Sequence, residues 1–120
     1  MILHIVGRAE WNDAQQRGQY APPPLRAEGF IHCSTLDQLL DTANRFFSGQ
    51  SDLVVLSIDE RRLVAPLRYE APAIALGERC DERFPHLYGP LNLDAVTRVV
   101  DFPSEPDGSF RLPAALCPAA

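Results

Sequence analysis

The run of apolar side chains at residues 53–58, Leu-Val-Val-Leu-Ser-Ile, constrains the fold more than any other feature of the sequence. Its length suits a strand, and its β-branched side chains pack well on the pleated surface of a sheet. Because successive side chains point to opposite faces, both faces of this strand are apolar and both must be covered. The sequence therefore predicts a central strand with other elements packed on each side.

The rest of the chain supplies further strands and two main helices. One helix is expected at residues 8–17, which Gly18 ends, and the other runs from a cap at Ser34 and Thr35 to Phe47. Further strands are expected near residues 3–5 and at residues 30–33, 67–70, 73–76 and 96–102. Together these elements predict an α+β fold, in which two main helices pack on a mixed, largely antiparallel sheet of five or six strands.

Several segments between these elements are expected to be irregular. Pro22–Pro24 fixes an extended, non-helical connection within residues 19–29. Residues 84–91 contain two prolines and a glycine, so we expect a shaped loop and no regular element there. Residues 106–108 have the composition of a turn, which can return residues 110–112 as a hairpin strand.

Length and charge limit the classes of function. The 120 residues suit one domain, expected at residues 1–112 with a loose tail at 113–120. The net charge of −5 argues against DNA or an anionic membrane as a partner held by bulk charge.

All 11 basic residues are Arg, and the absence of Lys excludes Schiff-base and Walker A chemistry. A cytoplasmic location is expected, because no apolar run approaches the ~20 residues of a membrane span and no signal peptide is recognisable.

The three histidines carry the clearest functional signal. His4 interrupts the apolar first strand, His32 comes just before the second helix, and His86 lies in the proline-shaped loop. Strand alternation turns His4 and His32 away from their apolar neighbours, so both can face a common side of the sheet. The apolar residues of the loop should hold it against the sheet and bring His86 to the same place. We therefore expect the three imidazoles to meet in one cleft.

Four further side chains are expected around this cleft. Ser34 and Thr35 follow His32 at a helix N-terminus, where hydroxyls and backbone N–H groups suit a phosphate-bearing ligand. Tyr88 is expected at the edge of the cleft, and Arg45, on the second helix, within reach of a phosphate.

Two other chemistries use some of the same side chains. His4, His32, His86 and Cys33 are acceptable zinc ligands by type, but their spacing matches no zinc motif, so no metal is expected. Cys33 with His86 as its base would make a thiol nucleophile. That arrangement is weaker, because strand alternation buries Cys33 when His32 is exposed.

Four motifs lie at residues 2–5, 29–34, 43–47 and 84–91. They are Ile-Leu-His-Ile, Gly-Phe-Ile-His-Cys-Ser, Ala-Asn-Arg-Phe-Phe and Phe-Pro-His-Leu-Tyr-Gly-Pro-Leu. They resemble the motifs of domain-of-unknown-function family 952, and the resemblance extends from Met1 to about Phe102. That family has no established activity.

The resemblance implies an ADP-ribosyltransferase-like fold, because the family has been grouped with the ADP-ribosyltransferases and RNA 2′-phosphotransferases. In those enzymes a histidine on the first strand hydrogen-bonds the nicotinamide ribose, and His4 is the matching position. The motif His32-Cys33-Ser34 resembles their second-strand motif. Many ADP-ribosyltransferases also use a late glutamate to orient the ribose. No glutamate here occupies a clearly equivalent place, and Glu70 is the nearest.

These observations lead to one hypothesis and two alternatives. The hypothesis is binding of NAD, ADP-ribose or a related phosphorylated nucleotide in a histidine-lined cleft, with ADP-ribosyl or phosphate transfer to or from NAD as its enzymatic form. His32 and His86 would be catalytic, and the ligand would be bound by His4, Ser34, Thr35, Arg45 and Tyr88. RNA and protein both stay open as acceptors. The alternatives are a non-catalytic small-molecule binding or sensor domain and a zinc-dependent hydrolase.

We predict that all three cysteines, Cys33, Cys80 and Cys117, are free thiols. Their number is odd, their spacing is wide and the expected compartment is reducing. Thiol titration of freshly purified, denatured protein should find three reactive groups. A single reactive group would reveal a disulfide and contradict the cytoplasmic assignment.

Overall fold

The computed structural model describes residues 1–71 and 82–116. The strands are β1 (Ile2–Gly7), β2 (Gln19–Tyr20), β3 (Ile31–His32), β4 (Leu53–Ile58), β5 (Leu67–Glu70), β6 (Phe84–Leu87), β7 (Leu91–Asn92) and β8 (Val96–Phe102). The helices are α1 (Arg8–Arg17), α2 (Pro23–Glu28) and α3 (Leu36–Phe46), with 3₁₀ helices at Glu60–Arg62, Leu93–Ala95 and Ala114–Leu116. The α+β class is therefore confirmed, as are both main helices.

The described strands form three antiparallel sheets and not the single sheet that the sequence predicted. Their orders are β1-β4-β8, β2-β7 and β3-β6-β5. The first and third sheets are joined by one bridge, in which Leu3 and Ser34 exchange backbone hydrogen bonds of 2.7 and 2.8 Å. β3 is only two residues long, and the segment that follows it pairs with β1 at this single point. The two sheets therefore do not merge into one continuous sheet.

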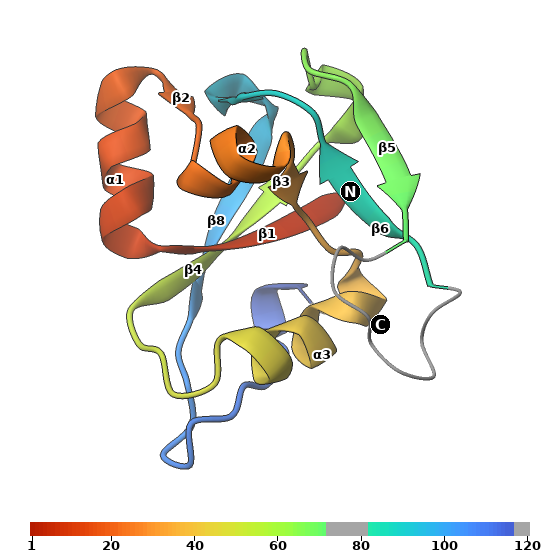
Figure 1. The fold of residues 1–120 in the computed structure, drawn as a ribbon. Coiled ribbons are helices and arrows are strands. Elements are labelled where there is room, and N and C mark those ends of the chain that lie inside the picture. The colour runs from red at the N-terminus through yellow and green to blue at the C-terminus, as the bar shows by residue number, and fades with distance from the viewer. Residues whose placement is uncertain (72–81, 117–120) are drawn as a thin grey trace.

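The predicted central strand, β4, is buried along its whole length. Val54, Leu56 and Ile58 point into one apolar cluster with residues of α1, β2, β3, β6 and β7. Leu53 and Val55 point into a second cluster with residues of α3. Figure 1 shows the corresponding layers, with α3 on one side of the β1-β4-β8 sheet and α1, α2, β3, β5 and β6 on the other. The histidines lie on the side of α1, α2, β3, β5 and β6.

Helix α1 has the bounds that its sequence signals predict. Gly18 takes the left-handed conformation with φ of 86°, and its N–H donates to the Ala14 carbonyl at 2.9 Å. Glycine tolerates this conformation without strain, so it ends the helix where the apolar pattern ends. Helix α3 begins at Leu36, and the Thr35 N–H donates to the Gln38 side chain at 3.0 Å, which satisfies a donor at the helix start.

Two proline-bearing segments are more regular than the sequence predicted. Pro22 is extended, but Pro23 begins α2, because the fixed φ of proline suits a first helical turn and no hydrogen bond is lost there. Residues 84–87, expected in a loop, form β6 between β3 and β5. Pro85 is accommodated there because its carbonyl still accepts from the Cys33 N–H at 3.0 Å.

The C-terminal segment also differs from expectation. Residues 110–112 do not pair as a strand; instead, Phe110 stacks on Phe102 with ring centroids 4.7 Å apart. Leu116, in the segment expected to be a loose tail, is buried in the second cluster. The strand expected at 73–76 lies outside the described residues. No helix among those residues is long and apolar enough to cross a membrane.

We predict that Leu56→Ala lowers the free energy of unfolding by about 2–5 kcal/mol, because it leaves a void in a fully buried position. The control is Val99→Thr, since Val99 pairs with Leu56 in the ladder but is 45% exposed. That change should stay within about 0.5 kcal/mol. Urea denaturation measures both. Equal effects of the two variants would contradict the central role of β4.

Candidate functional site

One cavity of about 550 Å³ receives all three histidines. Its wall contains apolar and aromatic groups, among them Phe46 from α3 and Phe84 from β6. The polar groups His4, Tyr20, His32, Ser34 and His86 lie on the same wall. The volume of the cavity and its combination of apolar, aromatic and polar side chains are typical of a small-molecule site. The expectation that the imidazoles share one cleft is therefore confirmed.

One strand pairing and the alternation of side chains along β1 bring the histidines together. His32 and His86 stand directly opposite each other in the β3–β6 pair, so their side chains share one face of that sheet. Their ring centroids are 5.7 Å apart. His4 is on β1, between Leu3 and Ile5, which point into the second apolar cluster. Alternation therefore turns His4 to the opposite side, toward β3.

Both ring nitrogens of His4 are already engaged. The Nδ1–H donates to the His32 carbonyl at 2.6 Å, and Nε2 accepts from the Tyr20 hydroxyl at 2.9 Å. Burial among these groups lowers the pKa of His4 to about 4, although part of the ring faces the cavity. Burial also raises the pKa of Tyr20, so its hydroxyl stays protonated and donates. His4 is thus a neutral ring that holds Tyr20 and β3 in place.

His32 is more exposed than the other two histidines. Its Nε2–H donates to the Glu28 carboxylate at 2.5 Å, and about two fifths of each side chain is exposed. Gly29 ends α2 between them, in the left-handed conformation, and this turn lets Glu28 face back toward His32. Phe30 lies against the His32 ring, with centroids 4.7 Å apart.

His86 is buried within a cluster of aromatic and carboxylate groups. Its ring stacks on Phe30, with centroids 4.1 Å apart and planes 20° from parallel. Its Nδ1–H donates to Glu70 at 3.0 Å, and the Tyr88 hydroxyl donates to the same carboxylate at 2.5 Å. The hydrogen bond from Tyr88, followed by that from His86, holds the pKa of Glu70 below its usual range. The carboxylate in turn raises the pKa of Tyr88.

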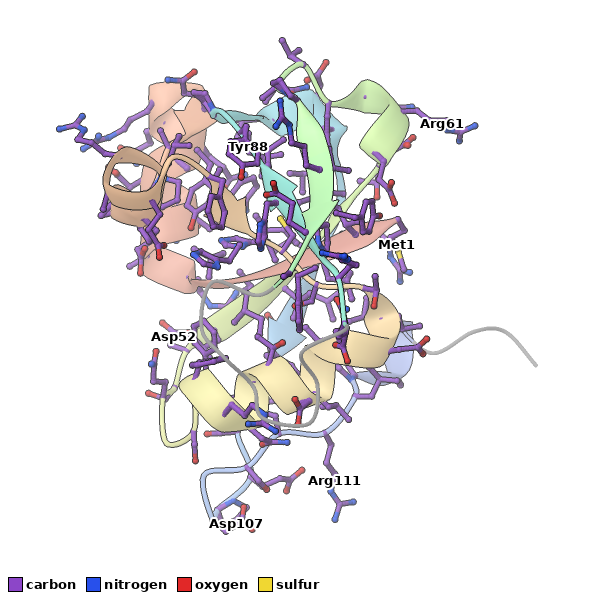
Figure 2. All side chains as sticks on the ribbon, turned by 45° about the vertical axis from the view of Figure 1, so that its right-hand side comes forward. Met1, Asp52, Arg61, Tyr88, Asp107 and Arg111 are labelled. Carbon is purple, nitrogen blue, oxygen red and sulfur yellow. The ribbon has the colours of Figure 1, made fainter. Side chains whose placement is uncertain are left out.

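Of the other expected ligand-binding residues, Ser34 lines the cavity, whereas Thr35, Arg45 and Tyr88 do not. Ser34 is buried and lines the cavity. Thr35 and Arg45 are not among the described residues that line it, and Arg45 pairs with Asp41 on α3 at 2.9 Å. Tyr88 lines a separate hollow. In Figure 2 it lies in the opposite half of the molecule from Asp107 and Arg111.

Cys33 also lines the cavity, but its chemistry does not suit a nucleophile. The side chain is 4% exposed, and burial raises the pKa of the thiol to about 12. It therefore stays a neutral thiol near pH 7. Cys33 is free, as predicted. The other two cysteines lie outside the described residues.

Three groups in this network were not predicted from the sequence. Tyr20 reaches His4 through the short β2–β7 pair, a contact between distant segments that leaves no local signal. Glu28 and Phe30 do carry one, because each lies within four residues of His32 in a segment that folds back at Gly29.

The chain is similar to a known protein family. A family model described as "Protein of unknown function (DUF952)" matches residues 5–99. The chain belongs to this family. No curated protein matches it.

Among solved structures, the fold of this DUF952 chain is similar to the crystal structure of protein CC0527 from Caulobacter crescentus. The TM-score is 0.80 at 38% identity, over 92% of this chain and 93% of that one. The solution NMR structure of CC0527 gives a TM-score of 0.78 at 37% identity, over 96% and 95% of the two chains.

We predict that His4 makes folding less favourable in acid. Its folded pKa of about 4 lies below the ordinary 6.5, so the unfolded chain binds more protons between these values. Stability contributed by the neutral ring is therefore present above pH 6.5 and is lost as the pH falls to about 4. The loss is roughly 3 kcal/mol at most.

Urea denaturation at several pH values, for the natural chain and for His4→Gln, measures this contribution. The variant cannot titrate at this position, so its stability should fall less over that interval. Parallel curves for the two proteins would contradict the assignment.

Proposed function

We propose that this DUF952 chain binds a nucleotide of the NAD or ADP-ribose class in the histidine-lined cavity. The observation that carries the proposal is the shared cavity itself, in which three imidazoles from β1, β3 and β6 converge beside apolar and aromatic walls. Such walls accept a flat ring, and a few fixed polar groups select its orientation. The sequence resemblance makes NAD and ADP-ribose the first ligands to test.

Hydrogen bonding to sugar hydroxyls is the best-supported part of the recognition. The Tyr20 hydroxyl donates to His4 and retains lone pairs that can accept from a ligand. His32, Ser34 and His86 lie on the same wall. His4 itself would act through Tyr20, since both of its ring nitrogens are engaged.

The phosphates of such a ligand should lie toward solvent. No Arg is among the described residues that line the cavity, and Glu10 is the acidic residue there. A buried phosphate without a positive partner would be costly. The ring and the adjoining sugar are therefore the parts expected inside.

Transfer of an ADP-ribosyl or phosphate group is the enzymatic form of the proposal. The position of Glu70 beside His86 supports it, because a carboxylate and an imidazole in contact are common acid–base groups. The alternative of a non-catalytic binding domain is favoured by the engagement of both His4 nitrogens, which marks His4 as a holding group. Product analysis after incubation with NAD separates the two.

The zinc-hydrolase alternative lacks a ligand set in the part of the chain that the structure describes. No three His, Cys, Asp or Glu side chains of residues 1–71 and 82–116 gather closely enough to hold a metal ion. Metal analysis of the purified protein tests this alternative directly.

We predict that millimolar NAD or ADP-ribose raises the melting temperature, because a ligand that binds only the folded state stabilises it. Thr42→Phe should abolish the shift, since Thr42 lines the cavity and a larger side chain would fill it. Arg45→Ala, on the same helix but away from the cavity wall, is the matched control and should keep the shift.

Calorimetry supplies the second measurement, with dissociation constants expected between about 1 μM and 1 mM. If NAD, ADP-ribose and ADP gave neither heat nor a thermal shift, the proposal would be wrong. Equal loss of binding in the Arg45 variant would place the ligand elsewhere.

A further inference from the structure

The Glu70–His86–Tyr88 cluster has a chemical capacity that nucleotide binding alone does not use. Glu70 is on β5, His86 is on β6, and Tyr88 follows β6 by one residue. In the β5–β6 register, Glu70 stands opposite Phe84 and Arg68 stands opposite His86. Glu70 and His86 are therefore diagonal neighbours on one face of the sheet, a placement from which long side chains can touch.

The carboxylate fixes which nitrogen of neutral His86 carries the proton. An ionised carboxylate can only accept hydrogen bonds, so the His86 Nδ1 at 3.0 Å must be the protonated nitrogen. The other nitrogen, Nε2, then carries the free lone pair. The Phe30 stack fixes the plane of the ring, so the direction of that lone pair is fixed as well.

His86 lines the cavity, and Nδ1 is the nitrogen that Glu70 engages. Nε2 makes no hydrogen bond to any described residue. The residue is 3% exposed overall and lines the cavity, which is therefore the space that Nε2 can reach.

Tyr88 keeps Glu70 in the form that this arrangement requires. Its hydroxyl donates to the same carboxylate oxygen as His86, and this bond is the largest cause of the lowered pKa of Glu70. The Arg68 guanidinium lies over the Tyr88 ring, 5.3 Å from its centroid. Two donors and a nearby cation thus stabilise the negative charge beside His86.

We propose that Glu70 is a positioning residue that presents His86 Nε2 as a proton acceptor at the cavity wall, so that the cavity deprotonates a hydroxyl group of its ligand or a water molecule. In this step the O–H bond breaks, its electron pair stays on the oxygen, and a new N–H bond forms at Nε2. The resulting imidazolium is stabilised by the Glu70 carboxylate, while the Nδ1–H stays in place. The step is a proton transfer from oxygen to nitrogen. The identity of the ligand rests on the proposed function above, whereas the presentation of Nε2 does not.

The first experiment determines the His86 tautomer without any ligand. Two-bond ¹⁵N–¹H correlation spectra of the full chain, at a pH of about 8.5 where free imidazole is neutral, distinguish Nδ1–H from Nε2–H. The natural chain should show Nδ1–H. Glu70→Ala should reduce the ratio of Nδ1–H to Nε2–H about tenfold, the worth of one hydrogen bond to a charged group.

Two variants serve as controls. Glu70→Gln keeps a side-chain oxygen that can accept from Nδ1–H, so it should keep the tautomer. Glu28→Ala removes the other carboxylate that contacts a histidine, at His32, and should leave the His86 signals unchanged. Backbone ¹⁵N–¹H spectra of each variant establish that it is folded.

The second experiment tests whether Nε2 is open and reactive. Diethyl pyrocarbonate acylates unprotonated imidazole nitrogens, and peptide mass spectrometry assigns the modified residue. On the folded chain, His86 should be modified and His4 should not, because both nitrogens of His4 are engaged. Thr42→Phe should slow the reaction at His86 by closing the cavity.

The results separate this proposal from nucleotide binding. An Nε2–H tautomer in the natural chain, an unchanged tautomer in folded Glu70→Ala, or no modification of His86 would overturn the proposal even if NAD binds. Conversely, an absent NAD response leaves a positive tautomer and modification result intact, and only the ligand would have to change.

Discussion

Burial of β4 on both faces is the constraint on which the rest of the structure depends. A strand without a polar face needs two separate apolar covers, and the chain supplies α3 on one side and α1 with the small strands on the other. The β1-β4-β8 sheet thereby becomes a partition between two cores. His4 can reach β3 only because β1 runs along the edge of this partition and turns His4 toward the first core.

The polar network of the site follows from placing imidazoles in that core. A buried polar ring needs partners, which His4 and His86 obtain from different parts of the chain, and the more exposed His32 is paired as well. His4 uses the His32 carbonyl and Tyr20, His32 uses Glu28, and His86 uses Glu70. The bond from His4 to the His32 carbonyl also ties β1 to β3. The same bonds that satisfy the rings therefore hold the short strands in register around the cavity.

The sequence predicted those elements that depend on interactions between residues close together in the chain. Helix α1 and strand β4 depend on periodicity and on a glycine stop, which can be recognised from the residues themselves. Pro85 argues against a strand in the sequence, because proline usually excludes a central strand, yet here only its carbonyl is needed for pairing. The meeting of His4 and His32 was predictable from strand alternation, whereas His86 arrives on strand β6 and not on the loop that the sequence predicted. Their partners were not, since the contact from Glu70 to His86 depends on a register between strands that no local pattern specifies.

The charge around the cavity decides which part of a ligand can lie deepest. His4 is neutral near pH 7 because burial lowers its pKa to about 4, so it offers hydrogen bonds and no positive charge. Glu28 faces His32, Glu70 faces His86, and Glu10 lies on the wall. An anionic group entering this surrounding would lose its hydration without a matching cation. Recognition of the proposed nucleotide would then rest on ring stacking and on hydrogen bonds to hydroxyl groups. Sites of that kind discriminate strongly against analogues that lack the hydroxyl, because a fixed polar partner is left unpaired. For the proposed nucleotide, these surroundings would favour selection of the sugar and ring over selection of the phosphates.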